Sequence, residues 1–185
     1  MSTDNEALRG LVSRPNSTSL ITELRGYGVR LVPTTVDDAS VLAQAAAAAP
    51  ADAFRWTFVP RTADEWATTI RDYADTGRHI FTVHYDGNVV GTTGYYDVES
   101  FNERSQPDVL EVGHTWYVPE VRGTNVNPAC KLLLFTHAFD GWQVARIGMP
   151  TAPRHAPSRP PRLKLRRTFA GSPRPPIPRP PPPPP

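Results

Sequence analysis

Proline is unevenly spread along this chain, and its distribution limits where the chain can fold. Of the 22 prolines in 185 residues, 15 lie in the last 36. Proline fixes φ and lacks the backbone N–H that helices and sheets use. We therefore expect a variable leader at residues 1–26, a folded domain at 27–149, and a disordered tail rich in Pro and Arg at 150–185.

Charge divides the chain at the same place. Residues 1–149 hold 12 Lys and Arg against 18 Asp and Glu, a net charge of −6, whereas the tail holds 8 basic residues and no acidic one. A protein binds the phosphates of nucleic acids through clustered positive charge, so no nucleic-acid partner is expected for the acidic residues 1–149.

The number of cysteines and the hydropathy of the chain indicate in which compartment the protein lies and whether it binds a metal. The single cysteine, Cys130, can form neither an internal disulfide nor a zinc set, so no metal is expected. The polar start is unlike a signal peptide, and no run of about 18 apolar residues occurs. The sequence therefore predicts a cytoplasmic protein with no membrane partner.

Hydrophobic periodicity predicts a chain of both strands and helices. Strands are expected over residues 28–33, 79–85, 89–98 and 109–118, and helices over 38–49, 62–75 and 129–140. Asp86-Gly87-Asn88 predicts a tight hairpin turn, and Thr62 with Glu65 predicts a capping box. The aromatic segment 54–58 either packs in the core or forms a wall of an acceptor site.

The segment Arg122-Gly123-Thr124-Asn125-Val126-Asn127 lies between a predicted strand and a predicted helix. Unpaired N–H groups converge at a helix start, and Gly123 permits the close approach of a pyrophosphate. The spacing is neither that of a P-loop nor that of the dinucleotide-binding fingerprint, which disfavours ATP and NAD. On this segment alone, a phosphate site and an ordinary turn both remain open.

The stretch Leu110–Pro119, followed by Arg122–Leu134, resembles the GNAT superfamily of acyl-CoA N-acetyltransferases, and most of all its ribosomal-protein N-acetyltransferase branch. The resemblance spans about residues 29–147. It implies an α/β (α+β) fold with a central mixed, mostly antiparallel sheet flanked by helices. The tail rich in Pro and Arg departs from the family, so we expect the C-terminal strands to be missing or disordered. The resemblance also implies acetyl-CoA as co-substrate, and a protein N-terminus or a small amine as acceptor.

Carried onto this chain, the resemblance assigns the CoA pyrophosphate to the loop and the pantetheine arm to the end of the preceding strand. Asn125 stands where the family often has Gly, and Asn tolerates a left-handed backbone well. The implied cofactor-binding residues are Thr115, Trp116, Tyr117, Val118, Arg122, Gly123, Thr124, Asn125, Val126 and Asn127.

An amine attacks a thioester only as the neutral species, so a base must take a proton from the ammonium group. Glu111 is our first candidate because some members of the superfamily have their base glutamate at this position; an ordinary strand carboxylate is the alternative. His114 competes, since imidazole titrates near neutral pH, but regular strand alternation puts it on the face opposite Glu111. A backbone N–H near Tyr117 is expected to hold the thioester oxygen, and Cys130 is expected to pack rather than react.

The chain departs from the family after about residue 147. Pro160 and Pro161 occupy an expected helix interior, where each costs about 3 kcal/mol. No tyrosine follows Tyr117 to serve as the acid that protonates the leaving thiolate. Two explanations account for this departure from the family. Either the protein is a genuinely altered or truncated relative, or a sequencing error in a GC-rich gene has garbled the C-terminal third, and we favour the sequencing error. The alternative functions are an inactive acetyltransferase-like protein and an interaction module whose tail, residues 173–185, docks on an aromatic-lined groove.

Overall fold

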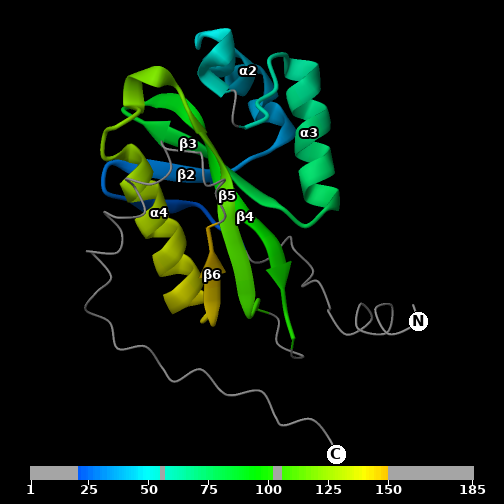
Figure 1. The fold of residues 1–185 in the computed structure, drawn as a ribbon, viewed down its shortest axis with the longest axis vertical. Coiled ribbons are helices and arrows are strands. Elements are labelled where there is room, and N and C mark those ends of the chain that lie inside the picture. The colour runs from blue at the N-terminus through cyan, green and yellow to red at the C-terminus, as the bar shows by residue number, and fades with distance from the viewer. Residues whose placement is uncertain (1–20, 55–56, 102–105, 150–185) are drawn as a thin grey trace, which may run out of the picture.

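The computed structural model describes residues 21–54, 57–101 and 106–149, and its ribbon is drawn in Figure 1. One sheet has the order β1-β2-β3-β4-β5-β6. All neighbouring strands are antiparallel except β5 and β6, which are parallel. This is the mixed, mostly antiparallel sheet that the resemblance predicts. The strands are β1 (Leu24–Gly26), β2 (Val29–Pro33), β3 (His79–Tyr85), β4 (Asn88–Glu99), β5 (Val109–Tyr117) and β6 (Arg146–Gly148).

Helices lie on both sides of this sheet (Figure 1). Helices α2 (Ala39–Ala47) and α3 (Ala63–Asp75) lie on one side, and α4 (Val126–Thr136) lies on the other. Helix α4 continues directly into the π-helical turn η6 (His137–Gly141). Three short 3-10 turns complete the described elements: η3 (Val36–Asp38), η4 (Ala51–Phe54) and η5 (Pro119–Val121).

Two local sequence signals are confirmed in full. Asp86 and Gly87 have φ of +49° and +75°, the left-handed pair that closes the β3–β4 hairpin. At the start of α3, the backbone N–H of Glu65 donates to the Thr62 hydroxyl at 3.2 Å, and the Thr62 N–H donates to the Glu65 carboxylate at 3.2 Å. This reciprocal capping box satisfies donors that the first helical turn leaves unpaired.

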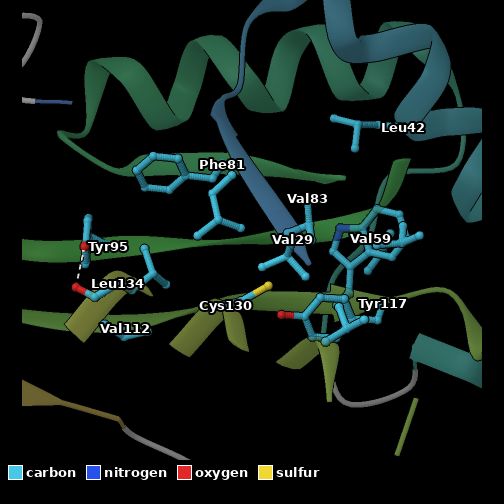
Figure 2. Close-up of a cluster of buried hydrophobic side chains, with 14 of the residues drawn as sticks. Val29, Leu42, Val59, Phe81, Val83, Tyr95, Val112, Tyr117, Cys130 and Leu134 are labelled. Carbon is cyan, nitrogen blue, oxygen red and sulfur yellow. Dashed lines mark hydrogen bonds between the residues drawn. The ribbon is translucent and has the colours of Figure 1, made fainter. Parts of the chain in front are cut away.

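The apolar core lies between the sheet and its helices (Figure 2). Leu31, Phe81 and Val83 are fully buried on the strands. On the α4 side, the buried Tyr95 hydroxyl donates to the Leu134 carbonyl at 2.7 Å, the dashed line in Figure 2. A hydrogen-bonded side chain thus ties α4 to the centre of the sheet.

Some boundaries differ from the sequence expectation. Helix α4 begins at Val126, three residues early, because Pro128 fits the first helical turn, where its missing N–H has no partner to lose. Residues 24–26, expected in the leader, form strand β1 against β2. The remainder of the leader, residues 1–20, and the tail, residues 150–185, lie outside the described residues.

Strand β5 contains a bulge that the sequence pattern did not predict. Gly94 pairs with Gly113 and Thr92 pairs with Trp116, so two residue steps on β4 face three steps on β5. The extra residue is His114, whose φ of +48° lies in the left-handed region. A bulge of this kind re-aims the side chains that follow it.

Candidate active site

One edge of β5 is left without a strand neighbour over its second half. Strand β6 pairs only with Val109–Glu111, and no other strand within residues 106–149 continues along that edge. The Val118 N–H donates to the Val90 carbonyl at 2.9 Å, so the neighbouring residue, Tyr117, turns its backbone groups away from β4. The Tyr117 carbonyl on that side accepts a hydrogen bond from Arg122 Nε at 2.9 Å.

The loop after this strand presents backbone donors at the start of α4. Residues 122–125 are exposed, and Gly123 has φ +76° with nothing within 4 Å of an added Cβ. The N–H groups of Arg122 and Thr124 donate to carbonyls within the turn. Among the described residues, no acceptor is bonded to the N–H groups of Gly123, Asn125 or Asn127. Three donors therefore remain at the positive end of the helix dipole.

Arg122 folds back on the end of the strand. Besides its bond to the Tyr117 carbonyl, its guanidinium lies 5.3 Å from the centroid of the Phe54 ring. The Arg61 guanidinium lies 5.0 Å from the same ring and donates to carbonyls at the end of α2. Two cations thus lie against one aromatic ring beside the exposed loop.

The strand-end residues of the predicted cofactor site divide between the two faces of the sheet. Thr115 and Tyr117 face α4, where Thr115 Oγ1 lies 2.9 Å from Thr93 Oγ1 and the Tyr117 hydroxyl lies 3.4 Å from Asn127 Oδ1. Trp116 faces α3 and packs edge-on against Phe54, at 5.4 Å between ring centroids. The main chain of this segment, rather than its side chains, therefore borders the unpaired edge.

Glu111 lies next to Tyr96 of β4. The two residues are cross-strand partners, and the Tyr96 hydroxyl is hydrogen-bonded to the Glu111 carboxylate. Burial, followed by this contact with Glu111, raises the pKa of Tyr96. The tyrosine therefore stays protonated at neutral pH and donates to the carboxylate.

His114 lies on the same face as Glu111, which corrects the expectation from strand alternation. Its ring centroid lies 5.0 Å from that of Tyr96 and 4.9 Å from that of Tyr73 on α3. The bulge is the reason, because one inserted residue reverses the alternation between positions 111 and 114. Burial lowers the pKa of His114 to about 4, below the near-neutral value expected from the residue type, so its imidazole is neutral at physiological pH.

Gly113 makes room for this arrangement. A Cβ at position 113 would lie 2.6 Å from a carbon of the Tyr96 ring. Any larger residue would therefore push the Tyr96 ring away from its place between Glu111 and His114.

Cys130 packs in the core, as its position on the helix predicts. It is fully buried and hydrogen-bonded to the Tyr117 side chain, and burial raises the pKa of its thiol to about 11. A thiol with that pKa is a poor nucleophile at neutral pH.

Sequence reasoning missed Tyr73, Tyr96 and Lys131. Tyr73 falls within the predicted helix 62–75 and Tyr96 within the predicted strand 89–98, and neither has a sequence signal that separates it from its neighbours. A usable signal existed for Lys131, because a charged residue inside the apolar run Ala129–Leu134 demands a buried polar partner.

Neither a cluster of metal ligands nor a membrane-spanning helix occurs among the described residues. No group of three or more His, Cys, Asp or Glu side chains in that part of the chain is placed to hold a metal ion. No helix among residues 21–54, 57–101 and 106–149 is long and apolar enough to cross a membrane.

The family model of the acetyltransferase (GNAT) domain matches residues 29–160 of this chain. The chain belongs to the GNAT acetyltransferase family. Its N-acetyltransferase class follows from that membership, and the open edge of β5 and the loop before α4 are features of this GNAT domain. None of the curated proteins compared with the chain matches it.

Solved structures similar to this GNAT chain share its fold. One is Mycobacterium smegmatis RimJ in complex with CoA-disulfide, at 21% identity and a TM-score of 0.62, covering 78% of this chain and 73% of that one. Another is a GCN5-related N-acetyltransferase from Brucella melitensis, at 20% identity, a TM-score of 0.64, and coverages of 84% and 68%. A third is the ribosomal-protein-S5-alanine acetyltransferase from Vibrio fischeri, at 14% identity, a TM-score of 0.62, and coverages of 80% and 81%.

Proposed function

We propose that this protein transfers an acetyl group from acetyl-CoA to a primary amine, either a protein N-terminus or a small amine, by direct attack within a ternary complex. The observation that carries the proposal is the set of unbonded N–H groups of Gly123, Asn125 and Asn127, next to the unpaired edge of β5. Family membership supports the reaction class.

The loop before α4 is suited to the pyrophosphate of CoA. Backbone N–H groups at a helix start bind anions through hydrogen bonds and through the helix dipole. Gly123 leaves open space on the loop, so a phosphate group can approach its main chain closely. Arg122, fixed by its bond to the Tyr117 carbonyl, adds a positive charge beside these donors.

The pantetheine arm carries amide groups and can pair with a strand edge as an extra strand does. The unpaired side of Thr115–Val118 offers such an edge, and the Tyr117 N–H is directed towards it. A donor at this place would stabilise the oxyanion that forms on the thioester carbonyl.

Glu111 is proposed as the base. Its carboxylate takes a proton from the acceptor's ammonium group, and the amine nitrogen then bonds to the carbonyl carbon as the C–S bond breaks. As the amide forms, its nitrogen loses one more proton, and the departing CoA thiolate takes up one proton and leaves as the thiol. Tyr96, which donates to Glu111, holds the carboxylate in place, and a neutral His114 leaves the acceptor cation free of a neighbouring positive imidazolium.

The test is binding followed by turnover with the full chain. Acetyl-CoA is titrated by calorimetry, and released thiol is then measured with small amines and with short peptides. Peptides with an N-terminal alanine come first, because a ribosomal-protein-S5-alanine acetyltransferase is among the similar structures. Saturable binding with thiol release supports the proposal. Binding without release for every acceptor would indicate the inactive acetyltransferase-like alternative, and absence of binding would overturn the function.

A further inference from the structure

Lys131 is a buried cation that the reaction described above does not use. It lies on α4, is 7% exposed, and points its ammonium group into the sheet. Lys131 Nζ donates to the Thr93 hydroxyl at 3.0 Å and to the Thr115 hydroxyl at 2.7 Å. No carboxylate in the described part of the chain is paired with it.

The direction of the two hydrogen bonds that Lys131 makes follows from the chemistry of an ammonium group. Since Lys131 only donates, the oxygens of Thr93 and Thr115 both accept from it. The Thr115 hydroxyl proton is then free for the Gly113 carbonyl, at 3.1 Å. Thr93 Oγ1 lies 2.9 Å from Thr115 Oγ1, within hydrogen-bond distance, and the Thr93 side chain is also hydrogen-bonded to the Tyr117 side chain.

These bonds converge on the bulge of β5. Gly113 and Thr115 flank His114, the residue at φ +48°. The His114 carbonyl accepts a hydrogen bond from the Thr92 hydroxyl at 3.0 Å. A threonine of β4 therefore binds the His114 carbonyl, and a threonine of β5, Thr115, binds the Gly113 carbonyl. Lys131 is the donor that orients the pair facing α4.

Packing alone gives no reason for a cation at this position. Burial lowers the pKa of Lys131 to about 8, which reflects the cost of holding its charge away from water. Helix α4 is already joined to the sheet by a hydrogen bond between two uncharged groups, the Tyr95 hydroxyl and the Leu134 carbonyl. Apolar replacements of buried charged groups are often neutral or stabilising.

We propose that Lys131 is a positioning residue that fixes the β5 bulge through Thr93 and Thr115, and so keeps Glu111 and His114 on one face and the Thr115–Tyr117 backbone directed to the open edge. Its catalytic consequence rests on the proposed acetyl transfer. Its structural consequence does not.

The activity experiment compares Lys131→Met with Tyr95→Phe in the full chain. Both changes remove a buried hydrogen-bond donor between α4 and the sheet, but only Lys131 donates to Thr93 and Thr115. We expect Lys131→Met to keep or raise the free energy of unfolding and to lower kcat by about 10²-fold, since small displacements at a reacting centre have effects of that size. Tyr95→Phe should lower the unfolding free energy while changing kcat less than threefold. Parallel losses of stability and kcat in both variants would overturn the proposal.

A second measurement needs no turnover. The His114 ring protons lie between Tyr73 and Tyr96 and should carry ring-current shifts in the proton NMR spectrum, assigned with His114→Gln. Lys131→Met and Thr115→Val should each remove these shifts, and the double variant should do no more than either one. Unchanged shifts in Lys131→Met would contradict the proposal even if the protein acetylates amines. If the wild-type protein shows no turnover but its ring-current shifts still depend on Lys131, the proposed function is wrong and the positioning role of Lys131 stands.

Discussion

Glu111 and His114 share one face of strand β5 although they are three positions apart. The Tyr96 hydroxyl is bonded to Glu111, and the Tyr96 ring lies 5.0 Å from that of His114. In a regular strand these two positions point to opposite faces. The bulge at His114 therefore collects a carboxylate, a tyrosine and an imidazole on the side of the sheet that α3 covers.

Replacing the candidate base should impair chemistry more than binding. Glu111→Gln keeps the size of the side chain but cannot accept a proton at neutral pH, so we expect kcat to fall by about 10²-fold or more. The affinity for acetyl-CoA should change less than twofold. Steady-state kinetics and calorimetry measure the two quantities. Glu99→Gln on β4 is the matched control, and equal kcat values for the two variants would exclude Glu111 as the base.

Adding a methyl group at Gly113 should displace Tyr96. The new Cβ would lie 2.6 Å from the Tyr96 ring, so Gly113→Ala should lower the free energy of unfolding by about 1–3 kcal/mol and reduce kcat. Gly141→Ala is the control, because its Cβ would meet its nearest neighbour at an ordinary 3.5 Å. Urea unfolding and kinetics test both. A Gly113→Ala variant as active as Gly141→Ala would argue against a role for the Tyr96 position.

Stability should fall as the pH is lowered from about 6.5 to about 4. Burial lowers the pKa of His79 to about 4 in the folded protein, whereas the unfolded chain titrates near 6.5. The unfolded state therefore binds the proton first, and the free energy of unfolding decreases by on the order of 1–3 kcal/mol over that window. His79→Gln should flatten the decrease more than His84→Gln, which replaces a less buried histidine. An identical pH dependence in wild type and His79→Gln would refute this assignment.

Local signals in the sequence predicted much of this fold. The Asp86-Gly87 turn and the Thr62–Glu65 capping box determine a hairpin and a helix start by contacts a few residues apart. The family resemblance, rather than the pattern of the strand, points to Glu111, and its catalytic role remains a prediction.

The bulge at His114 and the hydrogen bonds of Lys131 beside it could not be predicted from local sequence signals. A histidine at positive φ leaves no periodic signature, and its face depends on pairing with β4, which lies about 20 residues away in sequence. The role of Lys131 depends on threonines from two strands that meet only in the folded sheet.

The loop amides can be tested by substitution at a matched pair of glycines. Gly123 and Gly87 have nearly equal φ, +76° and +75°, and an added Cβ meets nothing at either place. Alanine at either position should therefore impose a similar backbone strain. We expect Gly123→Ala to weaken acetyl-CoA binding about tenfold, and Gly87→Ala to leave the affinity unchanged. Equal affinities in the two variants would argue against the loop as the pyrophosphate site.

The most direct test of the account is a titration of ¹⁵N-labelled full chain with acetyl-CoA, followed by amide NMR. We predict saturable shifts that are largest at the N–H groups of Gly123, Asn125, Asn127 and Tyr117, with little change at the β3–β4 turn. Saturable binding that leaves those four amides unmoved, or no binding at all by the folded protein, would contradict the claim that the start of α4 and the open edge of β5 hold the acetyl donor.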